Sequence, residues 1–230
     1  MILELIHVYF CLEIMTNFIP IFPLELVIYP GEKLNLHIFE DRYKQLISEC
    51  HKEGKPFGIP PVIKKKIAET GTLVQVTSLE KKYSDGRMDI TTKGVSVYRI
   101  LEVIDSIPGK LYGGAIVKHL PNDAEGVSKQ LQRIIDGTRE LHRLLHVIKT
   151  FDKPDAELKS YDIAHHAGLS LQEEYELLCL LQEDQRVEYL RRHLKKIIPV
   201  AASIETLKKK IQLNGHFKEL KGFDFGSGKK

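Results

Sequence analysis

The sequence FIPIFPLELVIYPGEKLNLHIFEDRYKQLI, residues 18–47, carries more structural information than any other part of the chain. From Leu34 to Ile38 apolar and polar residues alternate, which predicts a strand with one buried face. Pro30-Gly31 precedes this strand and predicts a tight turn. From Glu40 the apolar residues recur at helical spacing and acidic residues come first, as at a helix N-terminus. The stretch therefore predicts a strand, a turn, a second strand and a helix.

Short alternating segments continue from residue 62 to residue 119 and are separated by glycine-containing turns. Asp85-Gly86 lies between two such segments and is a strong local signal for a β-hairpin. The remaining turns are predicted at Thr70-Gly71, Lys93-Gly94, Pro108-Gly109 and Gly113-Gly114. Many short strands with regularly spaced turns are typical of a small, barrel-like β domain.

These segments resemble the N-terminal, substrate-binding domain of Lon proteases. The likeness begins with residues 18–47 and continues through 57–59, 71–76, 85–90 and 94–100, in the family's order and at similar intervals. The resemblance implies a PUA-like fold and a role in meeting protein substrates rather than in cutting them. Lon continues into an ATPase module and a serine-lysine protease domain. Because the likeness takes up most of the chain, we expect a stand-alone protein that lacks both.

Beyond Pro121 the apolar residues follow helical spacing. Those between Val127 and Ile148 form an amphipathic stripe, which predicts a helix. Residues 155–167 predict a short helix that ends at Gly168. Ser170 and Glu173 form a capping box and predict the start of another helix.

Two further helices are predicted over residues 187–198 and 204–213, on either side of Pro199. The segment 160–197 also resembles the helices that follow the β domain in Lon. The likeness is looser here, since helices rich in leucine and glutamate resemble one another.

The predicted fold class is α+β, with a PUA-like small β-barrel followed by an α-helical bundle. We expect a β domain at residues 15–120, a helical subdomain at 121–213 and a flexible tail at 214–230. Residues 1–14 lack the basic segment and the small-residue cleavage site that a signal peptide has, so their sequence does not predict a signal peptide. We interpret them as a non-native or disordered extension, with Met15 as the natural start, because the resemblance begins just after Met15.

The composition is that of an ordinary globular protein, with 43% hydrophobic and 28% charged residues among 230. Cys11, Cys50 and Cys179 are isolated and follow no zinc-binding spacing. Free thiols suit a reducing compartment, which favours the cytoplasm. We expect no membrane partner, because the apolar N-terminal segment is too short to span a bilayer.

No catalytic or metal-binding motif is complete in this sequence. His142 and His146 have the spacing of a zinc helix, but Arg143 stands where a metalloprotease has its glutamate. The C-terminal FGSGKK lacks the first glycine and the final Ser or Thr of a phosphate-binding loop. We therefore predict a protein that is not an enzyme and that holds neither a metal nor a cofactor.

Sequence-tolerant binding of polypeptide requires exposed apolar surface with a polar rim, because burial rather than exact hydrogen bonding must supply the affinity. Residues that match the family's opening motif are the candidates, with Asp41 and Arg42 as the rim. Tyr29 and Pro30 are expected to be exposed beside their turn, whereas Ile38 and Phe39 have core packing as the alternative role. The apolar candidates are Phe22, Pro23, Leu24, Tyr29, Pro30, Ile38 and Phe39.

The leading functional hypothesis is a non-enzymatic module that binds unfolded or misfolded polypeptides and presents them to a protease or chaperone, or holds them. The alternative is an RNA-binding PUA-like protein. It rests on residues 186–230, which contain 12 Lys and Arg against 4 Asp and Glu. Nucleic acid is the less favoured partner, because aromatic residues do not interleave with these basic ones. A third hypothesis is a fixed adaptor like cereblon, whose Lon-like domain is related, although no paired CxxC for its zinc domain is present.

Overall fold

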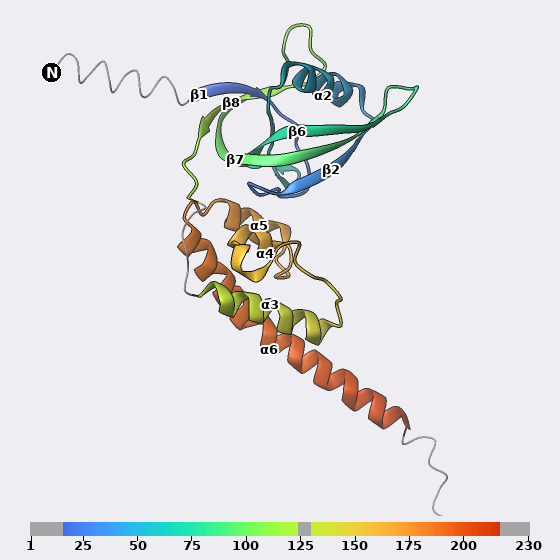
Figure 1. The fold of residues 1–230 in the computed structure, drawn as a ribbon, viewed down its shortest axis with the longest axis vertical. Helices are drawn as coiled ribbons and strands as arrows, with labels where there is room; N and C mark the ends of the chain where they lie inside the picture. The colour runs from blue at the N-terminus through green and yellow to red at the C-terminus, as the bar shows by residue number, and fades with distance from the viewer. Residues whose placement is uncertain (1–15, 124–129, 217–230) are drawn as a thin grey trace, which may run out of the picture.

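The structure, a computed structural model, describes residues 16–123 and 130–216 (Figure 1). A β part lies at one end, a helical part packs beside it, and helix α6 (Glu183–His216) extends away from both. The predictions for residues 1–14 and for the tail beyond residue 216 lie outside the described residues. Residues 214–216, predicted as the start of the tail, are the last residues of α6.

The β part contains a six-stranded antiparallel sheet in the order β1-β8-β7-β6-β3, with β2 paired to β7. The 17-residue β7 is its central strand. One edge of β7 pairs with β6, and the other pairs first with β2 and then with β8. The strands are β1 (Thr16–Pro20), β2 (Lys33–Ile38), β3 (Phe57–Ile59), β6 (Thr70–Lys82), β7 (Met88–Ile104) and β8 (Gly114–His119); β4 (Val62–Ile63) pairs separately with β5 (Lys66–Ile67).

The closed small barrel predicted from the turns is not confirmed. The strand path runs from β1 to β3, and its two ends are not joined by a continuous ladder in the described residues. The physical reason lies at the end of β1 and just beyond it, where Pro20 and Pro23 have no amide hydrogen to donate to a neighbouring strand. Isolated bridges join the ends instead, Ile21 to Gly58 and Leu24 to Pro61.

The hairpin and the first helix form where local sequence predicts them. Gly86 adopts a φ of 84° between β6 and β7, and its amide donates to the Tyr83 carbonyl at 3.0 Å. Helix α2 (Asp41–Glu53) ends at Gly54, which is left-handed with a φ of 65°. The buried face of α2 packs into the core of the β part together with Ile28, Ile38, Phe57, Val74 and Ile90.

The helical part contains α3 (Leu131–Leu145), a short 3₁₀ helix (Asp155–Glu157), α4 (Ser160–Ala164), α5 (Leu171–Leu178) and α6. The capping box at the start of α5 is confirmed, since the Ser170 side chain accepts from the Glu173 amide and the Glu173 carboxylate accepts from the Ser170 amide. The predicted helical bundle is not confirmed. Helix α3 packs along α6, whereas α4 and α5 have five and eight residues, and α6 continues past its neighbours (Figure 1).

Helix α6 runs through Pro199, where the sequence predicts a break between two helices. Pro199 is exposed, and the chain on either side keeps helical geometry despite the lost amide donor. The apolar spacing on both sides of the proline fits one continuous helix as well as it fits two. Among the described residues, no helix combines the length and the apolar character needed to cross a membrane.

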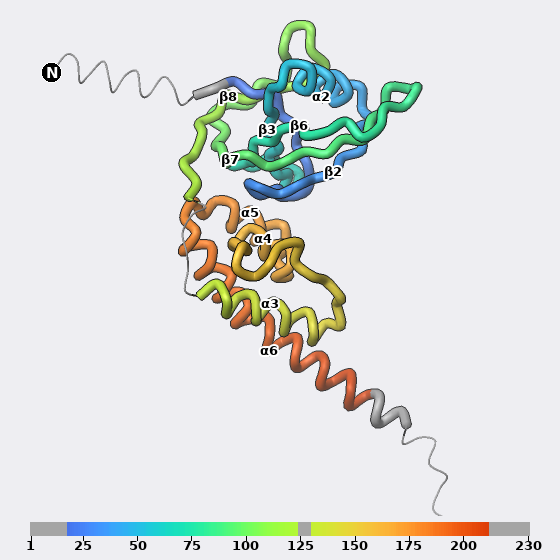
Figure 2. The backbone as a smooth tube through the Cα atoms, in the orientation of Figure 1, coloured from blue at the N-terminus to red at the C-terminus, as the bar shows by residue number. Residues whose placement is uncertain are grey.

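The β part and the helical part share a hydrophobic core. Val27, Tyr29 and Val97 from the β part are buried in the same cluster as the inner faces of α3, α4, α5 and α6. Figure 2 shows the chain leaving β8 and reaching the helical part, where the Asp123 amide donates to the Leu181 carbonyl at 2.8 Å. The β part also has two hydrophobic clusters of its own, so these three residues attach it to the core of the helical part.

Candidate functional site

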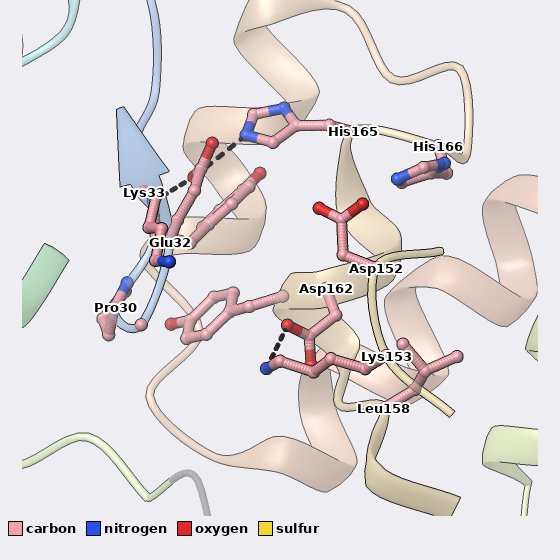
Figure 3. A pocket seen from close by; sticks show the side chains of 12 residues that line it. Pro30, Glu32, Lys33, Asp152, Lys153, Leu158, Asp162, His165 and His166 are labelled. Atoms are coloured by element: carbon pink, nitrogen blue, oxygen red, sulfur yellow. Dashed lines mark hydrogen bonds and ion pairs between the residues drawn. The ribbon is translucent and has the colours of Figure 1, made fainter. Parts of the chain in front are cut away.

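A cleft of about 520 Å³ lies between the β part and the helical part (Figure 3). The loop from Tyr29 to Lys33 forms one wall. The opposite wall consists of Asp152, Lys153, Leu158, Tyr161, Asp162, His165 and His166. Because both parts of the chain line the cleft, its shape depends on how they dock.

The wall from the β part is the turn that Pro30-Gly31 predicts. The Glu32 amide donates to the Tyr29 carbonyl at 3.1 Å, and Gly31 has a φ of 89°, as position three of a type II turn requires. The turn is tied to β7, because the Gly94 amide donates to the Glu32 carbonyl at 2.8 Å. A Cβ on Gly94 would lie 2.1 Å from the Tyr29 carbonyl oxygen, so this close approach requires glycine.

Tyr29 anchors the turn to the helices. Its side chain is 0% exposed, and its ring stacks on Tyr161 with the centroids 4.8 Å apart. The hydroxyl donates to the Glu174 carbonyl at 3.1 Å. Burial raises the pKa of the Tyr29 phenol, so the group stays neutral. The prediction that Tyr29 is exposed is wrong, because the side chain passes beneath the turn into the core of the helical part.

His165 joins the two walls. Its Nε2 lies 3.2 Å from a Glu32 carboxylate oxygen, and its Nδ1 lies 2.7 Å from a Glu174 carboxylate oxygen. Burial works against a charged ring, but the hydrogen bonds with Glu174 and Glu32 outweigh it and raise the pKa of His165 to about 9. At neutral pH an imidazolium therefore stands between two carboxylates.

The adjacent histidine has the opposite character. Burial, helped by the nearby Lys149 ammonium, lowers the pKa of His166 to about 4, so its ring is neutral. Figure 3 shows Asp152 between the rings of His165 and His166. Lys153 and Asp162 pair at 2.6 Å on the same wall. Four charged groups of the cleft thus form two ion pairs, Glu32 with His165 and Lys153 with Asp162.

Strand β2 leads from this cleft to the start of α2. Lys33 lines the cleft and opens the strand, and Phe39 follows its last residue and is 61% exposed. Lys33, Asn35 and His37 are exposed, whereas Leu34 and Leu36 are half-buried. The Nδ1 of His37 lies 2.5 Å from an Asp89 carboxylate oxygen across the ladder. A six-residue strand therefore connects the cleft with an exposed aromatic ring.

A second groove, of about 190 Å³, lies beside the first turn of α2. Arg42 lines it, with a guanidinium nitrogen 2.7 Å from Glu40 and the guanidinium carbon 4.5 Å from the Tyr43 ring centroid. Leu111, which also lines it, is 65% exposed. The other exposed or half-buried apolar side chains around it are Pro23, Ile67, Val103 and Ile104. The groove is thus apolar with a charged rim.

The structure separates the residues that the sequence groups as one binding surface. Tyr29 and Pro30 lie at the cleft, and Pro23 and Arg42 lie at the groove. Phe22 and Ile38 are buried in the core of the β part, where Phe22 stacks on Tyr43 at 3.8 Å. The other candidates are the half-buried Leu24, the exposed Phe39 and the exposed Asp41, which pairs with Lys44 at 3.1 Å.

Several residues of both sites are absent from the sequence-based candidates. Glu32 carries the one local signal, since it directly follows the predicted Pro30-Gly31 turn. His165 has no such signal, because its partner Glu32 lies 133 residues away in the chain. Glu174 pairs with His165 across nine residues, but nothing in that spacing indicates a cleft. Leu111 follows the predicted turn at Pro108-Gly109, but exposure cannot be read from that pattern.

The described residues give no sign of a metal centre: in the ranges 16–123 and 130–216, no three His, Cys, Asp or Glu side chains are arranged to hold an ion. His142 is buried and contacts the His166 carbonyl at 2.9 Å, while His146 pairs with Glu205 at 3.0 Å. Both histidines thus have partners within the fold.

Comparisons with known proteins agree on one family. The model of the ATP-dependent protease La (LON) substrate-binding domain matches residues 19–196. The fold is similar to a Lon N-terminal domain protein from Xanthomonas campestris, with 22% identity and a TM-score of 0.59 over 76% of this chain and 98% of that one. It is also similar to the N-terminal domain of the Mycobacterium avium complex Lon protease, with 12% identity and a TM-score of 0.56 over 78% and 99%. No curated protein matches the sequence, and none of these comparisons points to RNA binding.

Proposed function

Because the chain belongs to the family of LON substrate-binding domains, we propose that it binds segments of unfolded or misfolded polypeptide and has no catalytic role of its own. It holds such clients or presents them to a protease or chaperone in the cytoplasm. The family name supports a protein substrate, and the paired charges of the cleft support a role without catalysis.

The observation that carries this proposal is the exposed apolar surface around the start of α2. Leu111 and Phe39 are 65% and 61% exposed. Arg42 and Asp41 supply a charged rim. Exposed apolar groups with a polar rim mark interaction sites, and burial of such groups tolerates many client sequences.

The expected size of the effect follows from these exposures. Full burial of a leucine or phenylalanine side chain contributes about 1.5–3 kcal/mol. Since close to two thirds of each side chain is available, covering Leu111 or Phe39 contributes about 1–2 kcal/mol each. Removing one of them should weaken binding by about 5- to 30-fold.

The test measures fluorescence anisotropy of a labelled, reduced and carboxymethylated protein, which cannot refold, as Leu111→Asp, Phe39→Asp and wild-type protein are titrated into it. Ile148→Asp is the matched control, because Ile148 is fully exposed but lies beyond α3, in the helical part. We expect weaker binding by the first two variants and unchanged binding by the control. Equal loss in all three variants, or no loss in the first two, would rule out this surface.

A further inference from the structure

We propose that the client adds to the sheet as an extra strand along the open edge of β2, between the cleft and Phe39. This inference rests on the proposed function and specifies how the polypeptide is held. Strand addition recognises main-chain amides and carbonyls, which every client has, and therefore suits a protein that accepts many sequences.

The hydrogen bonds of β2 show which of its groups are available. In the described residues β2 pairs with β7 alone. The Glu32 carbonyl accepts from the Gly94 amide on β7. Because main-chain groups alternate in direction along a strand, the amides and carbonyls of Leu34, Leu36 and Ile38 also point toward β7. The amides and carbonyls of Lys33, Asn35 and His37 consequently point away from the sheet. All three residues are exposed, so a client can reach them.

The other edges of the sheet are less suitable for strand addition. The ends at β1 and β3 contact each other through the bridges of Ile21 and Leu24. The distal half of β6 has an open edge, but register shifts place Thr77 and Glu80 as extra residues there. Bulges and charged residues are devices by which proteins protect an edge from pairing. The ladder of β2 has no register shift over its six residue pairs.

The surroundings of β2 fit an extended client of about six residues, which spans about 20 Å. One end of the strand opens into the 520 Å³ cleft, and the other ends at the exposed Phe39 ring. On the inner face, alternate client side chains would cover the half-buried Leu34 and Leu36. Lys33 is the one formally charged residue of β2, so we expect the charge of a client segment to have little effect on its binding to this strand.

The test uses Asn35→Pro in the full chain, with Asn35→Ala as the matched control. Both substitutions remove the 2.9 Å hydrogen bond from the Thr91 hydroxyl to the Asn35 side chain. Proline also removes the outward amide, while the ladder to β7 remains intact, as proline on an edge strand permits. With the labelled unfolded protein as probe, we expect Asn35→Pro to bind about 10-fold more weakly or worse and Asn35→Ala to bind like the wild type.

Amide hydrogen exchange of the wild type provides a second readout that does not depend on the variant folding. We expect saturating probe to slow exchange at Lys33, Asn35 and His37. Normal binding by a folded Asn35→Pro protein, or unchanged exchange at these three amides while the probe is bound, would overturn strand addition and leave the proposed function standing. Failure of the wild type to bind the probe would overturn both. A dimer that Asn35→Pro converts to a monomer without probe would instead assign the edge to a second copy of the chain.

Discussion

Replacement of Arg186 by methionine tests how the helical part is held together. Arg186 is 0% exposed, and its guanidinium lies 2.8 Å from the buried Glu183 carboxylate. It also donates to the side chain of Asn122 and to the carbonyls of Leu180 and Asp123, at 2.8, 2.8 and 2.6 Å. The side chain therefore ties the segment after β8 to the start of α6.

The expected loss of stability has two contributions. Removing one member of a buried ion pair costs about 3–5 kcal/mol, because the remaining charge has no compensation. Carbonyls that lose a buried donor add about 1–3 kcal/mol. Ser160 still donates to Glu183 from its amide and hydroxyl, at 2.8 and 2.6 Å, which limits the total. We expect Arg186→Met to lower the free energy of unfolding by about 4–6 kcal/mol.

Urea denaturation followed by circular dichroism measures this loss. The double variant Glu183→Gln/Arg186→Met also removes the buried, unpaired Glu183 charge. Its free energy of unfolding should therefore be about 2 kcal/mol higher than that of Arg186→Met. Arg191→Met is the matched control, since Arg191 pairs with Glu188 at the surface, where water screens the charges, and its loss should change stability little. A loss below about 1 kcal/mol for Arg186→Met, or no recovery in the double variant, would refute the reasoning.

Three further predictions concern the junction and the helices. Gly94→Ala should lower the free energy of unfolding by about 1–3 kcal/mol in urea denaturation, because its Cβ would meet the Tyr29 carbonyl; unchanged stability would contradict the tight approach. His165→Gln should cost about 2 kcal/mol after allowance for the 31% exposure of the ring. The pKa of His165 in the folded state is raised to about 9. The difference in free energy of unfolding between wild type and His165→Gln should therefore be complete below about pH 6.5 and disappear as the pH rises through 9. A difference that does not depend on pH would contradict the ion pairs. Ser170→Ala should cost about 1 kcal/mol through loss of the helix cap, with Ser203→Ala in α6 as a control near zero, and equal effects would contradict the capping role.

The elements that sequence predicts well are those set by neighbours in the chain. The alternation in β2, the Asp85-Gly86 hairpin, the start of α2 and the Ser170 cap each depend on a few adjacent residues. The resemblance to Lon extends this local information to a family and to its arrangement of strands. The observed β part contains the predicted strands, but the closed barrel that the turns and the resemblance predict is not found in the described residues.

The features that sequence misses depend on contacts between distant segments. Tyr29 resembles an exposed turn residue until α4 and α5 are placed against it, and only then do Tyr161 and Glu174 bury it. His165 has no charged neighbour in the sequence that reveals its partner Glu32. Pro199 interrupts the pattern of α6 without interrupting the helix. For Tyr29 and His165, contacts with distant segments outweigh the local preference.

The most direct test of the central claim is titration of the wild-type chain with the labelled, permanently unfolded protein at low and at high salt. Burial of apolar surface and main-chain pairing depend weakly on ionic strength, whereas contacts to phosphates weaken steeply. We predict saturable binding with a micromolar dissociation constant that changes by less than about threefold between the two salt concentrations. Absence of saturable binding, or binding that high salt abolishes, would contradict a polypeptide-binding function of the kind proposed.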